Sequence, residues 1–219
     1  MKMWLIIGCL LGQTAVGEWI EPPTKSAKGY LVPSPNYQPN FPKDHGAHRG
    51  YGLEWWYWIG HLKEVDGERE FGFQSTVFRV AGEPQESLGF SNQSFGKQHL
   101  YLTHSALSDL ATGSYLHHER VAREGWQAQV SPDSLNMKVA GIEAQLNADG
   151  KGHRLLTQYP NSGKLELALV PLKPLVRFGD RGLSRKGDAP ASVSWYWTYT
   201  RLEAKGMISH KDEKIRVKG

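Results

Sequence analysis

The sequence predicts an all-β protein that folds as an antiparallel barrel. Short runs of residues alternate apolar and polar side chains with a period of two, and turn-forming residues separate these runs at close intervals. No long segment of the sequence shows the periodicity of an amphipathic helix. Many antiparallel strands joined by tight turns form a sandwich or a barrel, and roughly eight to ten strands around a bulky aromatic interior favour an up-and-down barrel of lipocalin type.

The first residues predict an exported protein. Residues 1–17 contain one basic residue, an apolar stretch, and small residues at Ala15 and Gly17 that suit a signal cleavage site. We expect the mature protein to begin near Glu18 and to reside in the periplasm or outside a bacterial cell. The segment ending at Cys9 resembles a lipobox, but only eight residues precede this cysteine, so lipoprotein anchoring is not expected.

A proline-rich lead-in follows over residues 18–45, and the barrel is expected over residues 46–205. Prolines remove backbone donors and bias the preceding residues toward extended shapes, so the lead-in should lie along a surface without regular structure. The stretches that alternate with a period of two predict the strands, which are 52–65, 68–80, 98–109, 114–123, 126–130, 135–146, 153–159, 164–172 and 193–208.

The first two predicted strands form a hairpin whose register follows from its turn. Asp66-Gly67 predicts a type I′ turn, because both central residues of such a turn have positive φ. Pairing Val65 with Glu68 across this turn places Glu54 directly opposite Arg79. A carboxylate and a guanidinium therefore become a cross-strand pair.

Both faces of this hairpin carry aromatic side chains. Trp56 and Trp58 share the face of Glu54, whereas Trp55 and Tyr57 lie on the opposite face. Large rings are favoured where a protein binds an apolar or ring-bearing ligand, and they are equally common in a plain core. The sequence leaves open which face lines the interior.

Two later segments interrupt the strand pattern. Residues 173–192 are the longest irregular stretch, which predicts either a functional loop or disorder. Residues 206–219 have the pattern of a strand, a charged turn and the beginning of another strand, so we expect them to start a truncated continuation.

The bulk composition is that of an ordinary globular protein. The chain has 219 residues and a net charge of +4, but its basic residues are scattered among acidic ones, so no nucleic-acid partner is expected. No apolar run reaches the roughly 20 residues of a membrane-spanning helix, so no stable membrane span is expected.

Five segments, in this order and spacing, resemble the AttH/carotenoid 1,2-hydratase-like family, whose members are often labelled predicted secreted hydrolases. They are EWWYWIGHL at 54–62, FGFQSTVFR at 71–79, THSALSD at 103–109, HHERVAR at 117–123 and SWYWTYTRLEAKG at 194–206. The resemblance implies a calycin-like protein of two consecutive lipocalin-type barrels that handles apolar, often terpenoid, molecules. It also implies a second barrel in the full-length protein that is missing or truncated in this sequence.

Glu54 and Asp109 are the candidate catalytic residues. Hydration of a carbon–carbon double bond needs a carboxylic acid whose pKa is raised by burial, with aromatic rings beside the cation that develops. Arg79 would act as an electrostatic partner of Glu54, although the two could equally form a structural ion pair. Asp109 could instead be a turn residue ahead of Ala111-Thr112-Gly113.

The candidate ligand-binding residues surround this hairpin and the next predicted strand; they are Trp56, Tyr57, Trp58, Gln74, Arg79 and His104. The common metal-binding spacings of histidine are absent from the sequence, so neither a metal nor another cofactor is expected. No G-x-S-x-G elbow supports a serine hydrolase.

Two functions remain open from the sequence. The protein could bind an isoprenoid or lipid-like molecule and promote acid-catalysed chemistry at a double bond. It could also be a carrier that binds the same kind of molecule without moving a proton.

Overall fold

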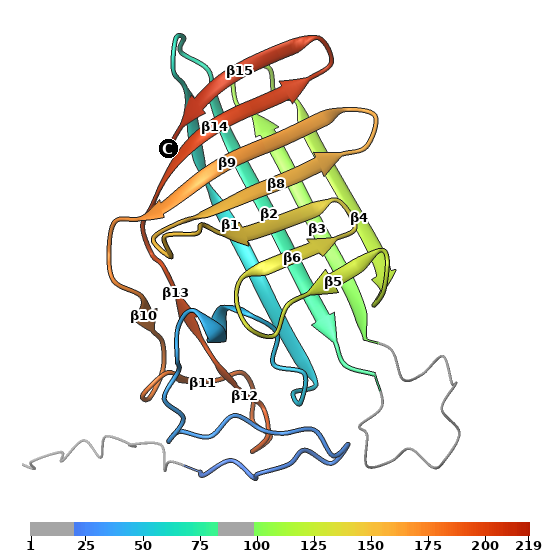
Figure 1. The fold of residues 1–219 in the computed structure, drawn as a ribbon, viewed down its shortest axis with the longest axis vertical. Helices are drawn as coiled ribbons and strands as arrows, with labels where there is room; N and C mark the ends of the chain where they lie inside the picture. The colour runs from blue at the N-terminus through green and yellow to red at the C-terminus, as the bar shows by residue number, and fades with distance from the viewer. Residues whose placement is uncertain (1–19, 83–98) are drawn as a thin grey trace, which may run out of the picture.

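The computed structural model describes residues 20–82 and 99–219, and these residues form an all-β protein (Figure 1). The predicted signal peptide and Cys9 lie outside the described residues. The short 3-10 helix η1 covers Lys43–His45. The strands are β1 Leu53–Glu64, β2 Glu70–Val80, β3 Leu100–Asp109, β4 Tyr115–Arg123, β5 Ala128–Val130, β6 Asn136–Val139, β7 Ile142–Leu146, β8 His153–Tyr159, β9 Gly163–Pro171, β10 Val176–Arg177, β11 Leu183–Arg185, β12 Val193–Trp195, β13 Trp197–Thr198, β14 Leu202–His210 and β15 Glu213–Lys218.

Eleven of these strands form one antiparallel sheet in the order β4-β3-β2-β1-β15-β14-β9-β8-β7-β6-β5. Strands β1 to β4 make one layer, and the remaining strands cross in front of it (Figure 1). The sheet thus curls into a nearly closed barrel whose two edges are β4 and β5. The predicted all-β barrel is confirmed.

The register of the first hairpin is confirmed, but its turn is not type I′. Glu54 pairs with Arg79, Trp56 with Val77 and Trp58 with Ser75, as the sequence predicts. Neither Asp66 nor Gly67 has a positive φ. The strands separate after Glu64 because the backbone N–H of Val65 donates to Arg216 O of β15, at 2.9 Å, and not to β2.

A second hairpin appears where the sequence predicts one continuous strand. The stretch 135–146 splits into β6 and β7, and Ala140 and Gly141 make the turn with φ of 42° and 97°. Positive φ at two successive residues is the signature of the tight hairpin turn expected at Asp66-Gly67. Alanine is not a turn signal, but Gly141 and a shift of the apolar residues from odd to even positions mark this break in the sequence.

The end of the chain belongs to the same sheet as the rest of the barrel. Strand β14 pairs with β9, and β15 pairs with both β14 and β1. The expected boundary between residues 205 and 206 therefore falls inside β14. Residues 206–218 join the two layers of this barrel and do not start a separate unit.

The face that carries Glu54, Trp56 and Trp58 points into the barrel. Trp58 is 7% exposed, and its neighbours on this face of β2, among them Val77 and Arg79, are fully buried. The opposite face of β1 exposes Ile59. The structure thus resolves which aromatic set lines the interior.

The lead-in and the long segment 172–201 pack together below the barrel end (Figure 1). The long segment is ordered by two small sheets, β10 with β13 and β11 with β12. The lead-in is irregular as predicted, but it does not lie only on the surface, because Val32 and Asp44 are buried. Ala47, which follows the lead-in, is buried as well. No helix in residues 20–82 and 99–219 is long and apolar enough to cross a membrane.

Candidate functional site

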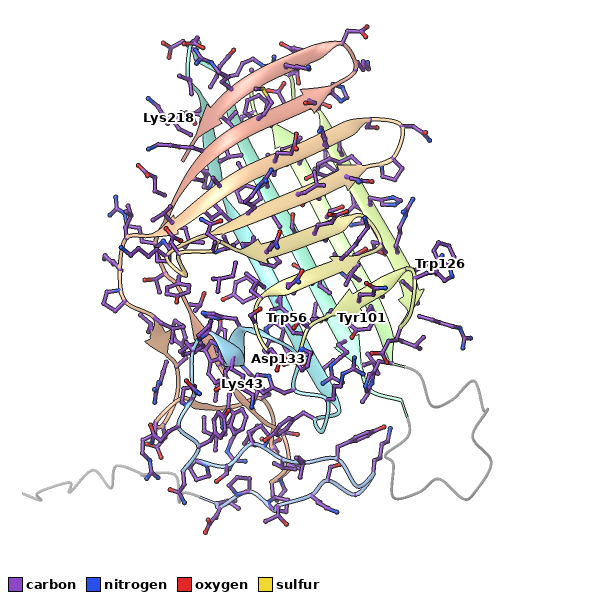
Figure 2. The ribbon with its side chains drawn as sticks, viewed as in Figure 1. Lys43, Trp56, Tyr101, Trp126, Asp133 and Lys218 are labelled. Carbon is purple, nitrogen blue, oxygen red and sulfur yellow. The ribbon has the colours of Figure 1, made fainter. Side chains whose placement is uncertain are left out.

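A cavity of about 1340 Å³ opens between the lower end of the barrel, the lead-in and the segment 172–201. Its walls include side chains from β1, β8, η1 and β12 to β14. Figure 2 shows Trp56 beside η1 at this end, with Lys218 at the opposite end of the barrel. Twelve aromatic residues contribute to the wall; they are Tyr30, Phe41, Tyr51, Trp55, Trp56, Tyr57, Trp58, Phe178, Trp195, Tyr196, Trp197 and Tyr199.

Glu54 and Arg79 form the predicted ion pair at the base of this cavity. Arg79 is fully buried, and its Nε donates to Glu54 Oε2 at 3.0 Å. Its Nη2 also donates to the backbone oxygens of His48 and Tyr51, at 2.9 and 3.0 Å. A guanidinium keeps its charge in any setting, so Glu54 lies beside a permanent cation.

The residues just before β1 add a histidine, His48, and a second carboxylate, Asp44, to this pair. His48 Nδ1 lies 2.6 Å from Glu54 Oε1, and His48 Nε2 lies 3.1 Å from Asp44 Oδ1. Burial alone would lower the pKa of His48, but the hydrogen bonds and negative charges of Glu54 and Asp44 outweigh it and raise the pKa. With both ring nitrogens facing carboxylates, the imidazolium form donates to each of them.

Asp44 anchors the other end of this network. It is 5% exposed and accepts hydrogen bonds from the Tyr37 hydroxyl, at 2.7 Å, and from the Asn40 backbone N–H. Burial would raise the pKa of Asp44, whereas the bonds from Asn40, Tyr37 and His48 lower it below its ordinary value. The network Asp44–His48–Glu54–Arg79 thus ties the lead-in to β1 and β2.

We expect the stability of the protein to fall at alkaline pH because His48 loses its proton. The folded-state pKa of His48 lies above its ordinary value of 6.5, so its contribution is complete below that value and is lost as the pH rises through the folded pKa. Urea unfolding of the wild type and of His48→Gln, from about pH 6 to about pH 9, measures this loss. A wild-type profile parallel to that of the variant would contradict it.

A second histidine lies deeper in the cavity. His153, at the start of β8, is 6% exposed and accepts a hydrogen bond from Trp58 Nε1 at 2.8 Å. Burial and the neighbouring His45 lower the pKa of His153 from 6.5 to about 4. Burial also lowers the pKa of His45, whose Nε2 lies 3.5 Å from the Tyr199 hydroxyl. Both rings are therefore neutral at neutral pH.

The aromatic segment 195–199 covers the cavity from below. Trp195 stacks on Tyr37 with ring centroids 3.9 Å apart, and Trp197 meets the ring of Phe41 edge-on at 5.7 Å. Tyr196 points the other way, and its hydroxyl lies 3.0 Å from that of Tyr57. Alternating side chains of one segment thus contact the lead-in and the outer face of β1.

Asp109 lies far from this site, at the opposite end of the barrel. Its carboxylate accepts from Arg69 Nη2 at 2.8 Å and from the backbone N–H of Ala111 at 3.0 Å. Burial would raise the pKa of Asp109, but the bonds from Arg69 and the turn lower it. Asp109 therefore lies away from the aromatic cavity, and its contacts are those of the turn residue that the sequence left open as the alternative.

Gln74 and His104 also lie outside the cavity. They occupy the outward face of β2 and β3, where Gln74 is exposed and His104 packs against Phe78 with ring centroids 5.4 Å apart. Of the other candidates, Trp56, Tyr57, Trp58 and Glu54 line the cavity, and Arg79 is buried behind Glu54. Within residues 20–82 and 99–219, no cluster of three or more metal-ligating side chains is present.

The sequence did not predict that residues just before β1 and at the start of β8 line this cavity. Asp44, His45 and His48 lie within five residues just before β1, a spacing that could have drawn attention to a network with Glu54. His153 carried no local signal, because its contact with Trp58 joins residues that are 95 positions apart.

Comparison with known proteins gives the family. The sequence matches a family model described as AttH-like over residues 32–219. The structure resembles the crystal structure of a candidate AttH from Nitrosomonas europaea, with a TM-score of 0.70 and 31% sequence identity. This match covers 84% of the present chain and 54% of the other, so the chain spans about half the length of that protein. None of the curated proteins compared matches the sequence. Because the family model covers most of its length, the chain belongs to the AttH-like family.

Proposed function

We propose that the protein binds an apolar, isoprenoid or lipid-like small molecule in the cavity beside β1. The observation that carries this proposal is the size and wall of the cavity, which offers about 1340 Å³ and whose wall includes twelve aromatic side chains. Sites for small molecules are typically concave and apolar, with a few polar groups that orient the ligand. The carboxylates in this wall are engaged with His48 and Arg79, so the remaining surface suits a ligand without many polar groups.

The geometry favours a binding protein over an acid catalyst. An acid that protonates an alkene must carry a proton at the working pH. Both carboxyl oxygens of Glu54 instead accept hydrogen bonds, from Arg79 Nε and from the ring and backbone of His48, so neither oxygen is placed to donate a proton to a ligand. Asp109 is paired with Arg69 outside the cavity.

Farnesene, a hydrocarbon made of isoprene units, is a suitable probe. Titrating it into the full chain should give a saturable change in tryptophan fluorescence. Replacing Trp56 by leucine removes aromatic wall, and we expect binding to weaken by about tenfold, the effect of losing a large part of one ring's buried apolar area. Recovery of the ligand with an added water would instead indicate hydration, and Glu54→Gln should then abolish that product.

Trp126→Leu is the matched control for the Trp56 variant. Trp126 is 87% exposed and projects from the opposite side of the barrel (Figure 2). Its replacement should leave farnesene affinity unchanged. The binding proposal fails if the wild type shows no saturable signal, or if the Trp56 and Trp126 variants bind equally well.

We also propose that binding takes place outside the cytoplasm, on the strength of the predicted signal peptide at residues 1–17. Expression in a bacterial host followed by fractionation should recover a periplasmic or secreted protein whose first residue lies near Glu18. A protein that keeps residue 1 and stays in the cytoplasm would contradict this.

A further inference from the structure

The cavity contains a buried histidine whose hydrogen-bonding capacity is only half used. Other polar groups of the wall have partners: His48 bonds to both Asp44 and Glu54, and the hydroxyls of Tyr57 and Tyr196 lie within hydrogen-bond distance of each other. His153 is buried to more than nine-tenths, lines the cavity, and uses one ring nitrogen to accept from Trp58 Nε1. Its second ring nitrogen bonds to no residue in the described part of the chain.

The bond from Trp58 determines which nitrogen of His153 carries the proton. An indole N–H can only donate, so Nε2 must be the unprotonated acceptor and Nδ1 must carry the hydrogen of the neutral ring. Burial holds the pKa of this imidazole near 4, so the neutral form with one donor persists at neutral pH.

The position of Nδ1 indicates where this donor points. Among the described residues, the fully buried side-chain atoms without a partner are Arg69 Nε, Tyr101 OH, His118 Nε2 and Ser194 Oγ. His153 Nδ1 has no partner either, yet it is not one of these fully enclosed atoms. Because His153 lines the cavity and this nitrogen is not fully enclosed, we take it to face the cavity, whose wall also includes Trp58, Leu135 and Leu146.

We infer that His153 is the polar anchor of the cavity and selects an uncharged ligand that carries an oxygen acceptor, such as an isoprenoid alcohol, ether or ketone. This inference deepens the binding function proposed above and rests on it. A buried donor without a partner is costly, so a ligand oxygen that accepts from Nδ1–H is favoured over a methylene at the same place. A carboxylate or phosphate would also have to lose its hydration in an aromatic pocket, which disfavours charged ligands.

The test compares two ligands that differ in one acceptor. Farnesyl methyl ether can accept but cannot donate, and farnesene lacks the oxygen. The measured quantity is the ratio of the dissociation constant of farnesene to that of the ether, in the wild type and in His153→Phe. The cost of taking the ether oxygen out of water enters both proteins equally, so it cancels in the comparison.

We expect the ratio to fall by about tenfold in His153→Phe, the usual contribution of one buried hydrogen bond. His153→Gln should restore part of the ratio, because its amide can accept from Trp58 and donate to the ligand. Trp126→Leu, which replaces an exposed ring outside the cavity, should leave the ratio unchanged.

The outcomes separate this inference from the function on which it rests. If both ligands bind but the ratio is equal in wild type, His153→Phe and His153→Gln, the anchor is refuted and the binding function stands. If neither ligand binds the wild type, both are refuted. Should His153→Phe fail to fold, His153→Leu takes its place, and a ratio in that variant equal to the wild-type ratio would equally overturn the role of His153.

Discussion

Replacing Arg79 by methionine should destabilise the protein by about 3 to 5 kcal/mol, the cost of breaking a buried ion pair by removing one partner. Arg79 is fully buried, and it donates to Glu54 and to the backbone oxygens of His48 and Tyr51. The variant leaves these acceptors without their donor. The substitution also loosens the segment just before β1, because two of the three hydrogen bonds of Arg79 reach His48 and Tyr51 in that segment. Urea unfolding at neutral pH measures the effect.

Arg216→Met is the matched control for this variant. Arg216 forms an ion pair with Asp66, but both side chains are 63% exposed, so water screens the pair and the stability should hardly change. In the background of Arg79→Met, the further change Glu54→Gln should recover part of the loss, because it removes the unpaired charge. If Arg79→Met is as stable as Arg216→Met, the ion pair does not support the fold.

Acidification should destabilise the protein by about 3 kcal/mol through His153 alone, the energy that corresponds to lowering a pKa from 6.5 to about 4. Between these two values the unfolded chain binds a proton at this position and the folded protein does not. Stability is therefore complete above pH 6.5 and falls as the pH drops toward 4. Protonation of Nε2 also removes the acceptor of the Trp58 indole.

The difference between the wild type and His153→Gln isolates this contribution. Glutamine does not titrate, and its carbonyl can still accept from Trp58, so the variant should lose less stability than the wild type from about pH 7 to about pH 4. Other groups titrate alike in both proteins and cancel. If the stability of the wild type and of His153→Gln changed with pH in parallel, His153 would not be held neutral by burial.

The strands and the first hairpin could be predicted because their signals are local. Alternation with a period of two places side chains on alternate faces, and one register then aligns Glu54 with Arg79 over the whole hairpin. The predicted residue pairs are correct although the predicted turn type is wrong, because the pairs depend on the register and not on the φ values of Asp66 and Gly67. The break at Ala140-Gly141 was not predicted, although the apolar residues shift from odd to even positions across that glycine.

The function of individual carboxylates was harder to predict. Glu54 and Asp109 look alike in the sequence, since each lies at one end of an aromatic or apolar strand. In the structure Glu54 faces the cavity, whereas Asp109 caps a turn at the other end and binds Arg69. The direction in which each strand runs through the barrel separates them, and that direction is set by pairings with distant strands.

The sequence by itself determined the all-β class, most strand positions and the pairing of Glu54 with Arg79. These follow from side-chain periodicity and from contacts between residues close in the chain. Only the tertiary structure decided which aromatic face lines the interior, and it alone brought His48 to Glu54 and His153 to Trp58. The physical reason is that closing a sheet of eleven strands depends on the summed packing of its whole interior, to which each local segment contributes only a part.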